Sequence, residues 1–143
     1  MSTRIPISTE RAPAAVGPYS QAIKCGDFLF ISGQLPIDMA TGEFPETIGE
    51  QARCCLKNLN AIAKEAGTSL DNAVKLTVFL TNMDDFAEMN SVYTEFFPAI
   101  PPARSTIAVA GLPKNAPIEI EAICALNDPK IVTLAGDRRS RAR

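Results

Sequence analysis

Alternating apolar and polar residues, or short runs of branched and aromatic residues, predict β-strands in four stretches of the chain. These are residues 27–33, 73–81, 105–110 and 118–125. Within residues 27–33, two sets of side chains should point to opposite faces of the strand. One face would carry Phe28, Phe30, Ser32 and Gln34, and the other Leu29 and Ile31. In residues 118–125, the same alternation separates Glu119 and Glu121 from the apolar positions between them.

Two other stretches have the spacing of helices. Residues 48–66 carry apolar side chains at helical spacing, with a Thr47/Glu50 capping box before them and Gly67 after them. A second helix should begin after Asn82 or Asp84 and end near residue 97. Its apolar stripe consists of Phe86, Met89, Tyr93, Phe96 and Phe97, with Asn90 among them.

The order of these elements predicts an α+β sandwich, in which one mixed sheet carries two helices on one face. Residues 1–22 read as an extended arm with a short strand near residues 5–7, and residues 100–104 as an extended segment held by prolines. The other face of the sheet would carry Ser, Thr and Glu side chains among apolar ones. A face of that kind suggests a covering subunit.

Composition excludes several classes of function. The chain has 143 residues, enough for one domain, and it has no histidine. Ser/His/Asp and Cys/His nucleophilic sites are therefore excluded. Its four cysteines form no CxxC pair, so we expect free thiols in a reducing compartment and no metal site. We expect a cytoplasmic protein with no membrane span and no secretory signal; no presequence is visible, although a mitochondrial pool remains open.

Charge is distributed unevenly along the chain. Residues 130–143 hold five basic residues and one acidic residue, whereas residues 1–129 hold nine basic and 15 acidic residues and so a net charge of −6. Nucleic acid is therefore an unexpected partner, because only the tail could supply a basic surface. We interpret residues 1–126 as the domain and residues 127–143 as a flexible, solvated tail.

Arg104 is the most distinctive candidate for binding a ligand. It follows Pro-Pro-Ala, opens a strand of small and apolar residues, and is the only Arg or Lys between Lys75 and Lys114. Its guanidinium could bind a carboxylate through two hydrogen bonds, or it could form a structural salt bridge to Glu119 or Glu121. The two glutamates could instead be solvated, and Tyr19 and Ser32 could be ordinary packed residues.

The same residues carry a resemblance to a known family. Matching segments occur in order and spacing in residues 12–21, 31–36, 78–80, 85–87, 102–105 (Pro-Ala-Arg-Ser) and 118–122 (Ile-Glu-Ile-Glu-Ala), together with Asn90. Over roughly residues 5–126 the chain resembles the RidA/YjgF family of reactive-intermediate deaminases, which is also labelled endoribonuclease L-PSP.

The resemblance implies a chorismate-mutase-like fold in a homotrimer with a central β-barrel and clefts between subunits. It also implies a deaminase that needs no cofactor. The substrates would be 2-iminopropanoate, derived from 2-aminoacrylate, and 2-iminobutanoate, which would be hydrolysed to 2-oxo acids and ammonia before they damage PLP enzymes. Alternatives are an endoribonuclease or translation inhibitor, and a non-catalytic, ligand-binding or chaperone-like trimer.

Carried over position by position, the resemblance implies roles for individual residues. Arg104 would bind the substrate carboxylate, and Glu119 would position or activate the attacking water. The pocket would be shaped by Tyr19, Ser32, Gly33, Phe86, Asn90 and Thr106. Thr106 departs from the family pattern, because many members have cysteine there, and this puts any thiol-based regulation in doubt.

Overall fold

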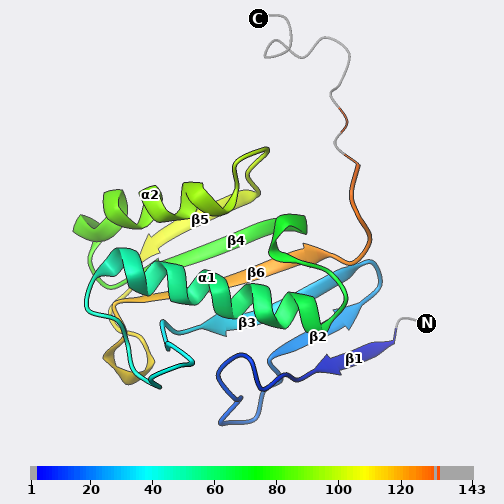
Figure 1. Cartoon of the computed structure of the whole chain (residues 1–143), viewed down its shortest axis with the longest axis horizontal. Coiled ribbons are helices and arrows are strands. Elements are labelled where there is room, and N and C mark those ends of the chain that lie inside the picture. Colours follow the sequence, from blue (N-terminus) through cyan, green and yellow to red (C-terminus); the bar gives the residue numbers. More distant parts are fainter. Residues whose placement is uncertain (1–2, 131, 133–143) are drawn as a thin grey trace, which may run out of the picture.

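One six-stranded sheet is covered on one face by two α-helices that lie side by side (Figure 1). The computed structural model describes residues 3–130 and 132. Its strands are β1 (Arg4–Ile7), β2 (Ala22–Cys25), β3 (Phe28–Gln34), β4 (Ala73–Leu80), β5 (Ala103–Ala108) and β6 (Ile118–Ala125). Its α-helices are α1 (Ile48–Glu65) and α2 (Phe86–Phe96).

The strands lie in the order β1-β2-β3-β6-β4-β5, with β1 and β5 at the edges. Every neighbouring pair is antiparallel except β4 and β5, which are parallel. The sheet is therefore mixed, and the predicted α+β fold with two helices on one face is confirmed.

The core lies between the helices and the sheet. Its fully buried side chains come from both helices and from β3, β4 and β6, and include Leu29, Leu56, Leu59, Ile62, Leu76, Met89, Ile118 and Ile120. The apolar stripe predicted for α1 is thus its buried face. The Oγ1 atom of Thr47 accepts a hydrogen bond from the Glu50 N–H at 3.2 Å, and Gly67 ends the helix with φ +89°.

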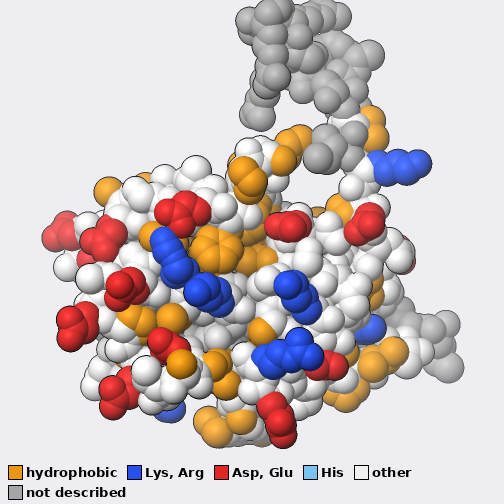
Figure 2. Space-filling model, in the orientation of Figure 1, with side chains coloured by type: hydrophobic (Ala, Val, Ile, Leu, Met, Phe, Trp, Pro, Cys, Tyr) orange, Lys and Arg blue, Asp and Glu red, His pale blue; other side chains and the backbone are white. Residues whose placement is uncertain are grey.

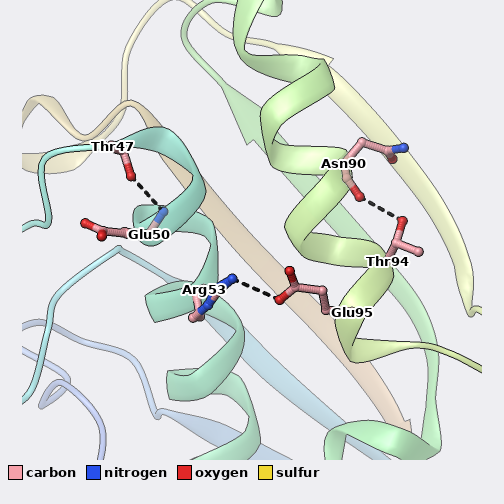
Figure 3. A network of polar contacts seen from close by, with 6 residues as sticks. All are labelled: Thr47, Glu50, Arg53, Asn90, Thr94 and Glu95. Carbon is pink, nitrogen blue, oxygen red and sulfur yellow. Dashed lines mark hydrogen bonds and ion pairs between the residues drawn. The ribbon is translucent and has the colours of Figure 1, made fainter.

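Polar contacts tie α2 to α1. The Glu88 Oε2 atom accepts a hydrogen bond from the Gly49 N–H at 2.7 Å, at the start of α1. Arg53 of α1 and Glu95 of α2 form an ion pair at 2.9 Å (Figure 3). On the helix-covered face, acidic and basic side chains are interspersed (Figure 2), so this face presents no continuous basic surface.

The opposite, open face of the sheet exposes large apolar side chains. Phe28, Phe30 and Ile107 are each between 42% and 45% exposed, and Glu121 lies on the same face. Alternation along β6 is as predicted, because Ile118, Ile120, Ala122 and Cys124 are buried while the glutamates point the other way. The mixed character expected of this face is therefore confirmed.

Three local predictions were wrong. Residues 22–25 form β2, a strand that was not predicted, since residue 22 was placed in the arm and residues 23–25 were given no element; β2 pairs with β3 across a turn in which Gly26 has φ +60°. Strand β5 begins at residue 103 rather than 105. Gln34 does not share a face with Phe28 and Phe30: a register shift between residues 31 and 34 turns it inward, opposite Ile120, where it is 4% exposed.

Within residues 3–130 and 132, no helix is long and apolar enough to cross a bilayer. The predicted tail, residues 127–143, falls mostly outside the described residues.

Candidate functional site

Arg104 projects from edge strand β5 toward the helix-covered side of the sheet. It pairs with Leu76 of β4, whose side chain is fully buried in the core, and paired residues share a face. Its Nη1 atom donates a hydrogen bond to the Asn90 Oδ1 atom at 2.8 Å. In Figure 3 the Asn90 side chain points away from α1, toward the edge strand.

The helical repeat of α2 arranges the surroundings of this guanidinium. Phe86, Asn90 and Tyr93 are spaced four and three residues apart, so they share one face of the helix. The Arg104 Cζ atom lies 4.6 Å from the centroid of the Tyr93 ring and 5.5 Å from that of the Phe86 ring. Both distances are in the range of cation–π contacts. Asn90 therefore has a polar partner that explains its place in an apolar stripe.

Arg104 forms no ion pair with any residue in 3–130 or 132. The one ion pair among these residues joins Arg53 and Glu95. The alternative of a structural salt bridge from Arg104 to Glu119 or Glu121 is contradicted, because both glutamates point to the opposite face of the sheet. A guanidinium has five N–H donors, and the bond to Asn90 uses one of them, on Nη1. Arg104 also lines a cavity of about 390 Å³ with residues of α2 and with Pro101 and Pro102.

Two buried hydroxyl groups lie close to Arg104 in the fold. Thr106 is two residues further along β5 and points to the same side, opposite Val78. Its Oγ1 atom and the hydroxyl of Tyr93 are buried without a hydrogen-bond partner among the described residues. Tyr93 was not a candidate from the sequence, although its position in the apolar stripe with Asn90 was the available signal.

Glu119 lies on the open side of β6, over the backbone of β3. A Cβ atom added to Gly33 would lie 2.5 Å from the Glu119 Oε2 atom, so a larger residue would displace the carboxylate from this position. The register shift in β3 places Gly33 there. Burial, and secondarily the nearby charge of Glu121, raises the pKa of the Glu119 carboxyl group.

Tyr19 and Ser32 flank this part of the sheet. Tyr19 is 51% exposed and lines a cavity of about 200 Å³ together with Gly33. The Ser32 hydroxyl donates a hydrogen bond to the Ser20 carbonyl oxygen at 2.6 Å, which holds the segment before β2 against β3. Ser32 thus has a structural partner, and its oxygen keeps acceptor capacity.

The structure therefore sorts the predicted site residues into two clusters. The Arg104 cluster consists of Phe86, Asn90, Tyr93, Arg104 and Thr106, and the Glu119 cluster consists of Gly33 and Glu119 with Tyr19 and Ser32 nearby. Within one chain the two clusters lie on opposite faces of the sheet and do not meet.

Three of the four thiols, those of Cys54, Cys55 and Cys124, are poorly suited to nucleophilic chemistry. Burial raises the pKa of Cys54, raises that of Cys55 strongly, and raises that of Cys124 to about 12. They are therefore protonated at neutral pH. Among residues 3–130 and 132, no group of three or more Cys, Asp or Glu side chains is arranged to hold a metal ion.

Comparisons with known proteins agree over nearly the whole described domain. A family model described as Endoribonuclease L-PSP matches residues 9–126. The chain is 62% identical to the RutC family protein y4sK of Sinorhizobium fredii over 122 residues, which are 85% of this chain and 97% of that protein. It is 48% identical to the chloroplastic Reactive Intermediate Deaminase A of Arabidopsis thaliana over 121 residues, which are 84% of this chain and 65% of that protein.

Among solved structures, the crystal structure of E. coli TdcF with bound serine matches with a TM-score of 0.81 at 45% sequence identity. The match covers 85% of this chain and 98% of that one.

Proposed function

Because this chain belongs to the RidA/YjgF family of reactive-intermediate deaminases, we propose that it hydrolyses α-imino acids to 2-oxo acids and ammonia. The substrates would be 2-iminopropanoate, the tautomer of 2-aminoacrylate, and 2-iminobutanoate. Their removal would protect PLP enzymes from attack. Each substrate already contains the C=N bond that water must attack, so the reaction requires no cofactor.

The observation that carries this proposal is the environment of Arg104. Its guanidinium is half-buried, has no carboxylate partner among the described residues, and borders a cavity. A cation held in this way suits the carboxylate of an α-imino acid, which can accept two parallel hydrogen bonds. The related TdcF structure holds serine, a molecule that also carries a carboxylate on its α-carbon.

Glu119 would supply the proton transfers. In the proposed reaction its carboxylate accepts a proton from the attacking water, whose oxygen bonds to the imine carbon. That proton passes to the imine nitrogen, which gives a carbinolamine. The carboxylate then takes the proton of the carbinolamine hydroxyl and delivers it to the amino nitrogen, so that the C–N bond breaks and ammonia leaves as the C=O bond of the 2-oxo acid forms. A raised pKa suits this role, because a general base or acid works best when its pKa is close to the pH of the reaction.

The two clusters would meet between subunits. Since Arg104 and Glu119 lie on opposite faces of one sheet, a site that uses both needs residues from two chains. The exposed Phe28, Phe30 and Ile107 give the open face the apolar character of a subunit interface. We therefore propose a homotrimer in which each cleft combines the Arg104 cluster of one chain with the Glu119 cluster of its neighbour.

A coupled assay tests the function. A PLP-dependent threonine dehydratase generates 2-iminobutanoate in water, and the protein should accelerate the formation of 2-oxobutanoate. In Arg104→Lys the two-point contact becomes a single one, so kcat/KM should fall by about 10- to 100-fold while the fold is kept. Glu119→Gln should abolish acceleration but still bind 2-oxobutanoate.

Glu121→Gln is the matched control, because Glu121 shares the strand face of Glu119 but is exposed. It should stay close to wild type. Full acceleration by Arg104→Ala would show that the carboxylate binds elsewhere. Unchanged acceleration by Glu119→Gln would rule out its proposed role, and failure of the wild-type protein to accelerate hydrolysis would rule out the function.

RNA cleavage is the rival function, because the matching family model bears the name endoribonuclease. The chain has no histidine to act as a base at neutral pH, and charges on its helix-covered face are interspersed (Figure 2). An anionic phosphate backbone would also be repelled by the net negative charge of residues 1–129. Salt-dependent cleavage of RNA by the purified protein, lost in Glu119→Gln, would revive this function.

A further inference from the structure

We propose that Tyr93 is a positioning residue that orients Arg104 through the face of its ring, an inference that rests on the deaminase function proposed above. The proposal starts from the geometry of α2. Phe86 and Tyr93 are seven residues apart, which is about 10.5 Å along a helix axis. Although the two residues are two turns apart, both ring centroids lie within 6 Å of the Arg104 Cζ atom, so both rings contact the same guanidinium.

Asn90 holds the guanidinium by a hydrogen bond, in addition to the two ring contacts. It lies between the two aromatic residues on the same helix face, and its Oδ1 atom accepts the hydrogen bond from Arg104 Nη1 at 2.8 Å. Of the two rings, that of Tyr93 is nearer to the guanidinium and is buried, at 5% exposure, whereas Phe86 is half-buried. A buried ring shielded from water gives the stronger cation–π contact. Tyr93 is therefore the less mobile of the two contacts.

This arrangement keeps the positive charge of Arg104 available. An arginine oriented by a carboxylate would have its charge neutralised and two of its donors occupied. Aromatic rings and an amide oxygen orient the guanidinium without a negative charge, so its remaining N–H groups can bind an incoming carboxylate. The position of Tyr93 thus serves affinity for the substrate anion rather than proton transfer.

The Tyr93 hydroxyl is not needed for this role. It is buried without a partner among the described residues, and burial raises its pKa. Tyr93→Phe keeps the ring and removes the orphaned hydroxyl, so it should bind substrate as well as wild type and unfold at the same or a higher temperature. Tyr93→Leu keeps an apolar side chain and removes the ring face.

Val92→Ala is the matched control. Val92 is buried on α2 beside Tyr93 but packs toward α1, where its Cγ2 atom would lie 3.4 Å from a Cβ atom added to Gly49, and it does not line the Arg104 cavity. Loss of packing is therefore common to Tyr93→Leu and Val92→Ala, whereas loss of the Arg104 contact is specific to Tyr93→Leu.

The experiment measures KM and kcat in the coupled assay, and the Kd of 2-oxobutanoate by calorimetry, for all three variants. Tyr93→Leu should raise KM and Kd by about tenfold with a much smaller change in kcat, and Tyr93→Phe and Val92→Ala should stay within about twofold of wild type. Equal effects in Tyr93→Leu and Val92→Ala would overturn the proposal, as would a loss in Tyr93→Phe that matches Tyr93→Leu. If wild type bound no 2-oxobutanoate and accelerated no hydrolysis, the proposed function itself would have failed.

A spectroscopic measurement covers the case in which Tyr93→Leu does not fold. The chain has no tryptophan and only two tyrosines, Tyr19 and Tyr93, so Tyr93 is the only tyrosine in a Tyr19→Phe variant. Saturation of that variant with 2-oxobutanoate should change the near-ultraviolet absorption of Tyr93, because the bound carboxylate alters the charge beside its ring. The change should be absent when Arg104→Lys is added. An unchanged Tyr93 spectrum in a variant that calorimetry shows to be saturated would overturn the proposal.

Discussion

The carboxylate of Glu119 lies in surroundings that work against its charge. It covers the backbone of Gly33, it is partly removed from water, and the charge of Glu121 is close by. Both effects favour the protonated form, and burial is the larger one. The charged form of Glu119 therefore lowers the stability of the fold, which is the cost of placing the proposed acid/base group there.

This cost predicts how stability depends on pH. The pKa of Glu119 is higher in the folded than in the unfolded chain, so its stabilising effect is complete below the unfolded pKa and is lost as pH rises through the folded pKa. Glu119→Gln does not titrate. The midpoint of thermal unfolding of Glu119→Gln, relative to wild type, should therefore increase as pH rises from about 4 to about 8. Glu121→Gln should show a smaller trend, and parallel curves for Glu119→Gln and wild type would refute the raised pKa.

An irregularity in strand β3 brings the residues of the Glu119 cluster together. Between residues 31 and 34 the register of β3 against β6 shifts, which turns Gln34 into the core and leaves Gly33 beneath the carboxylate of Glu119. A regular strand would place a side chain from every second residue on the open face. The bulge in β3 thus allows the Glu119 carboxylate of β6 to lie directly against the backbone at Gly33.

Gly33→Ala tests this element. Its Cβ atom would meet the Glu119 Oε2 atom at 2.5 Å, so the carboxylate must move. Stability should fall by about 1–3 kcal/mol, and the rate of imine hydrolysis by at least about tenfold. Gly111→Ala is the control, because a Cβ atom there meets nothing within 4 Å. Urea unfolding and the coupled assay measure both effects, and wild-type activity in Gly33→Ala would contradict the assigned geometry.

Periodicity predicted the elements but not their irregularities. Helices α1 and α2 and strands β4 and β6 were recognisable because their side-chain periods extend over eight or more residues. Strand β2 has four residues and no clear alternation, so it was missed. The inward turn of Gln34 could not be predicted either, because a bulge is defined by the partner strand and not by the sequence of its own strand.

Some candidate site residues lie together, but their arrangement was not predictable. Arg104, Asn90 and Phe86 are in contact, and their role in a site stays a prediction. That Arg104 and Glu119 lie on opposite faces depends on how β5 and β6 each pair with β4, and this pairing joins residues far apart in the sequence. Local patterns carry no information on such register.

Across the whole molecule, the candidate site residues form two separate clusters. The Arg104 cluster lies at edge strand β5 on the helix-covered side, and the Glu119 cluster lies on the open side, where large apolar side chains are exposed. A cyclic assembly that joins unlike surfaces brings the two clusters together once per interface. In the proposed trimer, each site therefore takes Arg104 and Glu119 from different chains.

Assemblies that mix two inactive variants test whether each site combines residues of two chains. Arg104→Lys and Glu119→Gln chains, each with its own affinity tag, are produced together in equal amounts, and assemblies that carry both tags are purified and assayed for imine hydrolysis. If each site combines two chains, random mixing restores about a quarter of the sites, so the unselected mixture should regain about a quarter of wild-type activity and the doubly tagged fraction more. Activity no higher than that of the two separate variants would contradict the claim, because it would mean that both residues act from the same chain.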